Sequence, residues 1–292
     1  AGYFDLSHRD FAEGVRADIS IALGELGIHT HTSHHEVSDG QHEINFEYAD
    51  AITTADRVIT LKYVTKIIAT LHDLHASFMP KPIFGLNGSG MHTHMSLFNK
   101  KNENAFYNPE NKFNLSKTAQ YFIAGILANI KEITSVLNPT VNSYKRLVPG
   151  HEAPTYISWA NRNRSALIRI PAGKKQGTRC ELRSPDLSGN PYLQFAVMLA
   201  SGLDGIKKKT PLPPPVEKNI YALTNKERKK YEIERLPESL GHALAFMRKS
   251  ELLKQTLGPH IFDNYLHVKH EQWEDYRKQV TPWEINKYLH LL

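Results

Sequence analysis

The spacing of apolar residues predicts two long helices in the first quarter of the chain. The first is expected to be capped by Ser7 and to run through about residue 24. Its apolar residues recur every four positions, as on one face of a helix: Phe11, Val15, Ile19 and Leu23. The second pattern covers residues 51–77 and places on one side Leu61, Val64, Ile68, Leu71 and His75. Both patterns predict amphipathic helices that pack against a neighbouring layer.

Helix signals return later in the chain. Ser116 is expected to cap a helix through about residue 137, and another helix begins after Pro191 and ends near the basic run 207–209. Residues 211–215 are too rich in proline for a helix or a central strand and predict a stiff connector. The tail is expected to be helical in two or three pieces, the last capped by Thr281 and beginning at Pro282.

Between the helices, alternating and extended patterns predict short strands. Residues 28–37 and 42–48 flank a turn at 38–40 and are expected to pair as a hairpin. Strands are also expected at 91–98, 165–170 and 178–184, whereas the polar segment 138–163 predicts a long loop. Because helices and strands do not alternate regularly, the chain is expected to be α+β rather than a doubly wound sheet.

Composition and charge exclude several classes of protein. The 292 residues carry 36 Lys and Arg against 30 Asp and Glu, a formal charge of +6. This excess is small and spread along the chain, so we expect anionic small-molecule substrates and no nucleic acid. The single cysteine, Cys180, cannot form an internal disulfide. No apolar run approaches the roughly 18 residues that cross a bilayer, and no signal peptide is visible, so we expect no membrane partner and a cytoplasmic location.

Two carboxylates flank the turn of the predicted hairpin. Glu36 and Glu43 leave adjacent strands next to Gly40, so their side chains can converge and bind a hard cation through oxygen. Five histidines lie within residues 29–42, but their spacing differs from the H-E-x-x-H pattern of zinc proteases. The hairpin therefore favours an oxygen-rich cation site over a zinc protease.

Two further strands present polar rows. Alternation places His92, His94 and Ser96 on one face, next to the N-G-S-G loop, whose glycines would allow a ligand to approach the backbone. In the strand 178–184, alternation projects to one side Arg179, Glu181 and Arg183. A carboxylate between two guanidinium groups is either a structural salt-bridge ladder or a metal site beside an anion. The residues alone leave both alternatives open.

A cluster of arginines surrounds Glu152. Five charged residues fall within 24 positions: Arg146, Glu152, Arg162, Arg164 and Arg169. They could form a solvated basic face, but Arg164 and Arg169 flank an apolar strand, and fixed guanidinium groups of this kind bind phosphate. Neither a P-loop nor a Rossmann glycine motif is present, so those two modes of nucleotide binding are not expected.

Taken together, five motifs in order resemble the glutamine synthetase family of the bacterial and archaeal type I class. They are H-H-E-V-x-x-G-Q-H-E, N-G-S-G-M-H-T-H-M-S, N-S-Y-K-R-L-V-P-G-H-E-A-P, N-R-S-A-L-I-R-I-P and R-C-E-L-R-S-P-D, and they span essentially the whole chain. The resemblance implies a catalytic domain over residues 1–292, with a curved, mostly antiparallel sheet packed with helices as in the glutamine synthetase and guanido kinase fold. It implies an ATP-dependent ligase that joins ammonia to L-glutamate through a γ-glutamyl phosphate.

The resemblance also implies a role for each motif residue. Divalent cations, Mg²⁺ or Mn²⁺ and two or three per site, would be bound by Glu36, Glu43, His92 and Glu181. Glutamate would be bound by Asn87, Gly88, Arg146, Glu152 and Arg183. ATP, the co-substrate, would be bound by His94, Ser96, Arg164, Arg169 and Arg179. The catalytic residues would be Glu152, Arg164 and Arg146, with Glu152 closing over the intermediate and receiving a proton from ammonium.

The chain also departs from the family pattern. A first strand with two more metal-binding glutamates and a small N-terminal domain are expected before Ala1. We therefore expect a catalytic segment of a longer enzyme that is inactive by itself. His31 stands where relatives commonly have a nucleotide-contacting glutamate, and the expected lysine before the R-C-E-L-R strand is shifted, with Lys174 one of its candidates. The tail matches the segment that joins the two rings of a homododecamer.

Two other functions are compatible with the same motifs. A ligase that joins glutamate to another amine, such as putrescine, would share the glutamate pocket, and product analysis would distinguish it. A noncatalytic member of the family would act through protein contacts, but the retention of all four predicted metal ligands argues against it.

Overall fold

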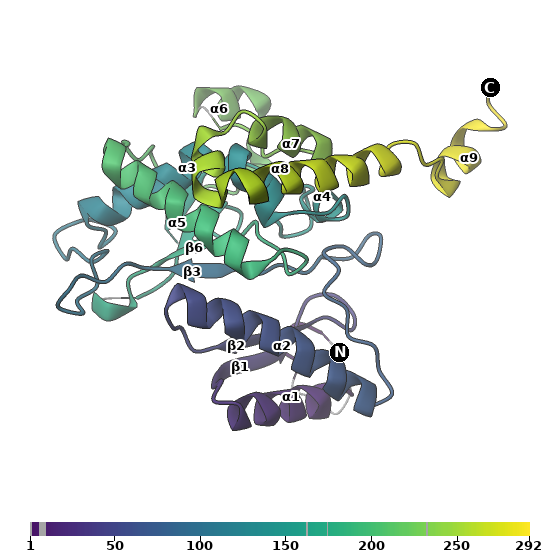
Figure 1. Ribbon diagram of the computed structural model, residues 1–292, viewed down its shortest axis with the longest axis horizontal. Coiled ribbons are helices and arrows are strands. Elements are labelled where there is room, and N and C mark those ends of the chain that lie inside the picture. The colour runs from purple at the N-terminus through teal and green to yellow at the C-terminus, as the bar shows by residue number, and fades with distance from the viewer. Residues whose placement is uncertain (1, 6–9, 162, 174, 232) are drawn as a thin grey trace.

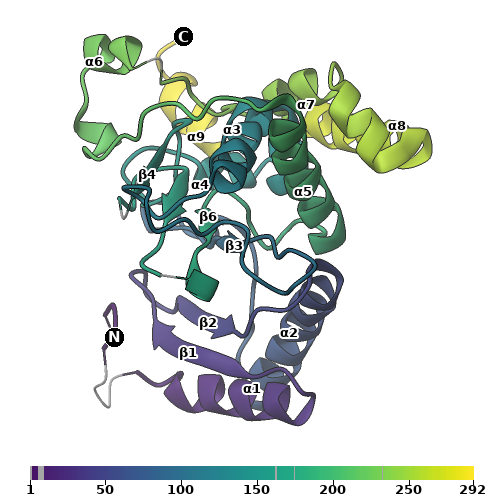
Figure 2. The same ribbon diagram turned by 90° about the vertical axis from the view of Figure 1, so that its left-hand side faces the viewer.

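The computed structural model describes residues 2–5, 10–161, 163–173, 175–231 and 233–292. The predicted cap Ser7, together with Arg162 and Lys174, lies outside the described residues. The chain folds into a small lobe, which contains the hairpin, and a larger lobe, which contains a second sheet and most of the helices (Figures 1 and 2). In both Figure 1 and Figure 2, the hairpin of the small lobe faces the second sheet.

The small lobe is a hairpin covered by two helices. Strands β1 (Thr30–His35) and β2 (His42–Phe46) pair antiparallel, as the sequence predicts. Helix α1 (Glu13–Glu25) packs against α2 (Ala51–Leu71) and the hairpin through a small apolar core. Its buried members are Val15, Ile19, Leu23, Ile28, Leu61 and Val64. The prediction for Phe11 is wrong: it precedes α1 and is 93% exposed.

Helix α2 ends earlier than its apolar pattern predicts. Asp50 caps its first turn, accepting from the amides of Ile52 and Thr53. At the other end, Asp73 adopts a left-handed conformation with φ of 56°, and the amide of Leu74 donates to the carbonyl of Ala69 at 2.8 Å. This closing pattern stops the helix at Leu71, so the predicted extension to residue 77, with His75 on the buried side, is wrong.

The larger lobe contains a four-stranded sheet in the order β3-β6-β5-β4. Its strands are β3 (Thr93–Met95), β4 (Trp159–Asn161), β5 (Ile168–Ile170) and β6 (Cys180–Leu182). All pairs are antiparallel except β4 with β5, which are parallel. The α+β class with mostly antiparallel pairing is confirmed. The three predicted strands of this sheet, β3, β5 and β6, are each shorter than predicted, and β4 lies in a segment predicted to be a loop.

Two helices bury the core of this lobe. Helix α3 (Lys117–Leu137), capped by Ser116, and α5 (Pro191–Lys208), capped by Asn190, confirm the predicted helices. They cross at two glycines: a Cβ on Gly125 would lie 2.3 Å from the carbonyl oxygen of Ser201 and 2.7 Å from Gly205. Only residues without a side chain allow this close approach.

Shorter elements complete the chain. The predicted loop 138–163 instead contains α4 (Ser143–Arg146) and β4. The proline-rich segment 211–215 has no regular structure, as predicted, and its Pro213 carbonyl accepts from the Trp159 indole at 2.6 Å. The remaining elements are η1 (Lys175–Gly177), η2 (Ile220–Ala222), α6 (Asn225–Lys230), α7 (Leu240–Met247), α8 (Glu251–Tyr276) and α9 (Pro282–Tyr288).

The C-terminal helix α9 projects away from the body of the molecule (Figure 1). Thr281 caps it and Glu284 completes a capping box, which confirms the predicted start at Pro282. Within the described parts of the chain, none of the helices combines the length and the apolar character needed to span a bilayer.

Candidate active site

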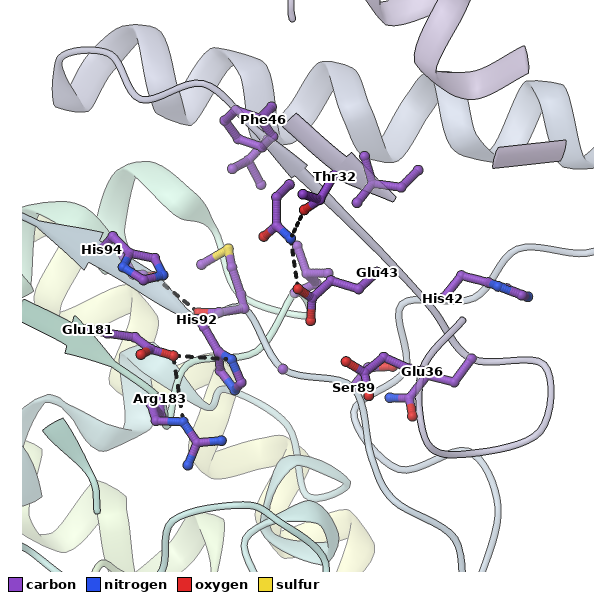
Figure 3. A pocket seen from close by; sticks show the side chains of 18 of the residues that line it. Thr32, Glu36, His42, Glu43, Phe46, Ser89, His92, His94, Glu181 and Arg183 are labelled. Atoms are coloured by element: carbon purple, nitrogen blue, oxygen red, sulfur yellow. Dashed lines mark hydrogen bonds and ion pairs between the residues drawn. The ribbon is translucent and has the colours of Figure 1, made fainter. Parts of the chain in front are cut away.

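A cavity of 2420 Å³ lies between the hairpin and the four-stranded sheet. Residues far apart in the chain line it, from both lobes. The structure brings together around this cavity every residue for which the sequence predicts a role in the site: Glu36, Glu43, Asn87, Gly88, His92, His94, Ser96, Arg146, Glu152, Arg164, Arg169, Arg179, Glu181 and Arg183. Figure 3 shows the two hairpin glutamates on one side and His92 with Glu181 on the other.

On the hairpin side, two carboxylates converge with a histidine. The side chains of His34, Glu36 and Glu43 each offer a ligand atom, and these atoms lie within 4.8 Å of one another. Glu36 is only partly compensated, by His34 at 3.2 Å and by the Val37 amide at 3.0 Å. Burial, together with the negative charge of Glu43, therefore raises the pKa of Glu36. A divalent cation would relieve this repulsion, so these donors fit a hard cation.

His34 is not among the metal ligands that the sequence motifs predict. His34 lies directly opposite Glu43 in the hairpin register, and it shares a strand face with Glu36 two residues away. Applying strand alternation to both arms of the hairpin would have placed these three side chains together.

A second group beneath the hairpin also combines a carboxylate with histidines, but the positive charge of an arginine side chain lies within it. Ligand atoms of Asp10, His35 and His42 also lie within 4.8 Å of one another. The guanidinium of Arg16, however, binds Asp10 at 2.7 Å and His42 at 2.8 Å. Burial and the charge of Arg16 lower the pKa of His42 to about 4. This group is therefore a structural link between α1 and the hairpin.

On the sheet side, Glu181 is 2% exposed and surrounded by cationic groups. Arg169, opposite it on β5, binds one carboxylate oxygen, and Arg183 lies 3.6 Å from the other. The Nδ1 atom of His92 lies 3.5 Å from the same oxygen as Arg183 (Figure 3). Behind the strand, Cys180 and Leu182 are fully buried, as alternation predicts. The salt-bridge ladder is thus present.

His92 is the member of this group that faces the cavity, with 34% of its side chain exposed. The pKa of His92 lies well below its ordinary value, mainly because hydration is restricted in the cavity. The positive charges of Arg183 and Arg146 lower it further. The neutral imidazole that results is the form that binds a metal ion. The ladder and a cation site are therefore compatible at this position.

Farther along the same face, Arg179 contacts His94. Its Nε atom donates to His94 Nδ1 at 3.0 Å, and a terminal nitrogen donates to the Gly177 carbonyl at 2.9 Å. Burial lowers the pKa of His94. The pair therefore holds an arginine, a neutral histidine and Ser96 along one wall of the cavity.

Arg146 is predicted to bind glutamate, but the structure shows its guanidinium buried and bonded to backbone carbonyls. It is 3% exposed, and its guanidinium donates to backbone carbonyls of Ser184 at 2.6 Å and Arg183 at 3.0 Å. Burial lowers its pKa to about 10. The N-G-S-G glycines pack on this side chain: a Cβ on Gly90 would lie 2.3 Å from an Arg146 nitrogen. The glycines thus admit Arg146, whereas the sequence predicted that they admit a ligand.

Arg183 links the sheet to two loops over the cavity. One terminal nitrogen donates to the carbonyl of Glu152 at 3.4 Å, and the other donates to the carbonyl of Arg164. Arg164 in turn donates to the hydroxyl of Tyr3 at 3.4 Å. This bond, with further support from the carboxylates of Glu152 and Glu36, raises the pKa of Arg164. The loops therefore hold a fixed positive charge above the hairpin carboxylates.

The fold and this cavity of acidic and guanidinium groups define a catalytic-domain architecture with known relatives. Residues 1–288 match the model of the family "Glutamine synthetase, catalytic domain", and the chain belongs to that family. It is 55% identical to the glutamine synthetase of Clostridium saccharobutylicum and 54% identical to that of Thermus thermophilus, over 99% of this chain and 65% of each relative. The chain thus spans about two thirds of the length of these relatives.

A solved structure shares the same fold. The GmaS/ADP complex superposes with a TM-score of 0.90 at 37% sequence identity, and the match covers 99% of this chain and 66% of that protein. A second structure, GmaS without ligand, gives a TM-score of 0.88 at 36% identity.

Proposed function

We propose that this chain is the catalytic domain of an ATP-dependent ligase that converts L-glutamate and ammonia to L-glutamine. The observation that carries the proposal is the meeting, across one cavity, of the hairpin carboxylates and the His92–Glu181 pair, with guanidinium groups beside them. Phosphoryl transfer requires this combination of cation ligands and fixed positive charge. Family membership supports it.

The two sides of the cavity would each hold a divalent cation, Mg²⁺ or Mn²⁺. Glu36 and Glu43, with His34 beside them, would bind on the hairpin side, and His92 with Glu181 on the sheet side. When bound, such ions neutralise the charge that develops on the transferring phosphate. The donor set of carboxylates and neutral imidazoles fits this chemistry.

The remaining residues would bind and orient the substrates. Arg164, Arg169 and Arg179, together with His94 and Ser96, line the walls where the phosphates of ATP would lie. A second set would bind glutamate: Asn87, Gly88, Arg146, Glu152 and Arg183. In this arrangement Arg146 also fixes the backbone of the glutamate pocket, because its donors bind the carbonyls that follow β6.

The reaction would proceed by activation of the carboxylate. An oxygen of the glutamate side chain attacks the γ-phosphorus of ATP, and ADP leaves with the electron pair of the broken P–O bond. Ammonia then attacks the acyl carbon, and phosphate leaves. Arg164 would stabilise the transferring phosphate, while Glu152 would accept the proton that ammonium loses and close the loop against water.

Assembly and location follow from the same proposal. We propose a cytoplasmic homo-oligomer, a dodecamer, in which α9 contacts another subunit and a neighbouring subunit completes each active site. Because this chain spans 65% of its relatives, we expect the isolated segment to be inactive.

The test is product analysis of the full-length protein. With ATP, Mg²⁺, glutamate and ammonium, we expect equal amounts of glutamine, ADP and phosphate. The same assay with putrescine in place of ammonium tests the alternative ligase, for which the γ-glutamyl amine would be the main product. Metal-dependent ATP binding without any product would indicate a noncatalytic family member.

A further inference from the structure

One half-buried tyrosine contacts the loop that carries Glu152 and has no role in the scheme above. Tyr221 lies on η2, and its hydroxyl donates to the backbone carbonyl of Ala153. The ring is half-buried beside the cavity. Burial raises the pKa of the Tyr221 hydroxyl, so the group stays protonated and donates this bond at neutral pH.

The bond falls where the loop changes from exposed to buried. Residues 149 and 150 and Glu152 are exposed, whereas Ala153 is 2% exposed and the three residues after it are buried. Gly150 and Glu152 have left-handed backbone conformations, with φ of 89° and 55°. Arg183 donates to the Glu152 carbonyl at 3.4 Å, which is a long hydrogen bond. The Tyr221 bond thus marks the fixed end of a loop that carries an exposed carboxylate.

Tyr221 is itself held firmly. The Asn219 side chain caps η2 by accepting from the Tyr221 amide at 3.1 Å. Ile220, fully buried, donates its amide to the Ser165 hydroxyl at 3.2 Å. Ser165 directly follows Arg164, so one short network joins the turn at Tyr221 to both loops that cover the cavity. An anchor of this kind can transmit its position to the loop without touching a substrate.

We propose that Tyr221 is a positioning residue that fixes the hinge of the Glu152 loop at Ala153. This inference rests on the proposed function, in which Glu152 closes over the acyl phosphate. Without the hydroxyl, Glu152 would be held less accurately and water would reach the intermediate. The water oxygen then bonds to the acyl carbon, the bond from that carbon to the phosphate oxygen breaks, and glutamate and phosphate are released with a proton passing to solvent.

The experiment compares Y221F with Y156F in the full-length protein. Tyr156 is 5% exposed and its ring lies 6.2 Å from that of Tyr221, but the hydrogen-bond partner of its hydroxyl is Arg235, which donates to it at 3.3 Å, and not the Ala153 carbonyl. For Y221F we expect kcat for glutamine to fall roughly 10- to 100-fold, the scale of a misplaced catalytic group. The ratio of ADP to glutamine should rise above one. For Y156F the ratio should stay at one.

A second readout does not depend on turnover. Hydrogen exchange of the peptide 149–155 should be faster in Y221F than in wild type and unchanged in Y156F. If Y221F does not fold, N219A, which removes the cap of η2, should show the same two effects. Coupled turnover with unchanged exchange in Y221F would overturn the proposal. Wild-type protein that makes no glutamine would overturn the proposed function instead, and the exchange comparison would still decide whether Tyr221 anchors the loop.

Discussion

The two sides of the cavity differ in how the negative charge of their carboxylates is compensated. On the sheet, Glu181 is almost fully buried, yet two arginines and His92 surround it. On the hairpin, Glu36 and Glu43 are half-buried, and their polar partners are a histidine, an amide side chain and a backbone amide. On the sheet side the protein itself compensates the charge of Glu181, and His92 is the group that still faces the cavity and can bind a cation. The hairpin side keeps a net repulsion that raises the pKa of Glu36.

It follows from this difference that residue type alone does not define a metal ligand. A buried carboxylate that is fully paired contributes to stability through its partners, and removing one partner is costly. A partly open pair of carboxylates without a cation contributes little to stability and is available for binding. The same reasoning separates the Asp10 group, which contains Arg16, from the Glu36 group.

The largest expected effect comes from neutralising the paired carboxylate. E181Q leaves Arg169, Arg183 and His92 without their shared anion, so we expect a loss of about 3 kcal/mol in the free energy of unfolding. The matched change E43Q removes a repelled charge and should alter stability by less than about 0.5 kcal/mol. Urea unfolding of the full-length proteins in EDTA, followed by circular dichroism, measures both. Equal losses in the two variants would contradict the comparison.

A smaller effect tests the glycine-rich loop that joins the two sides. In G88A, the new Cβ would lie 2.3 Å from the Pro80 carbonyl oxygen and 2.9 Å from an Arg146 carbon. We expect destabilisation of about 1–3 kcal/mol, as for overpacked sites. The control G14A places its Cβ in open space on the exposed side of α1 and should stabilise the protein by roughly 0.5–1 kcal/mol. Thermal unfolding of both variants decides it; an unchanged G88A would mean that this packing is not needed.

The helices and the hairpin could be predicted because their signals are local. Ser116 and Thr281 cap α3 and α9 at the expected positions, and the Ser38–Gly40 turn joins β1 to β2. The end of α2 could not be predicted, because it depends on a left-handed Asp73 and not on the apolar pattern. Phe11 continues a four-residue repeat but precedes the first helical residue, so it never joins the stripe.

The site was predicted as a set of residues, but several contacts depend on the tertiary fold. The residues that the family resemblance assigned to the site all line one cavity. The sequence could not show that the guanidinium of Arg146 is used by backbone carbonyls of a distant segment. Nor could it show that Tyr221 contacts Ala153, since 68 positions separate them.

The central claim is that each side of the cavity provides a cation site. The most direct test counts, by electron paramagnetic resonance, the Mn²⁺ ions that bind to the full-length protein. If the hairpin and the sheet each provide a cation site, wild-type protein should bind about two or three Mn²⁺ per chain, and E43Q and H92N should each lose about one. Loss of the same single ion in both variants, or unchanged binding in either, would contradict the account.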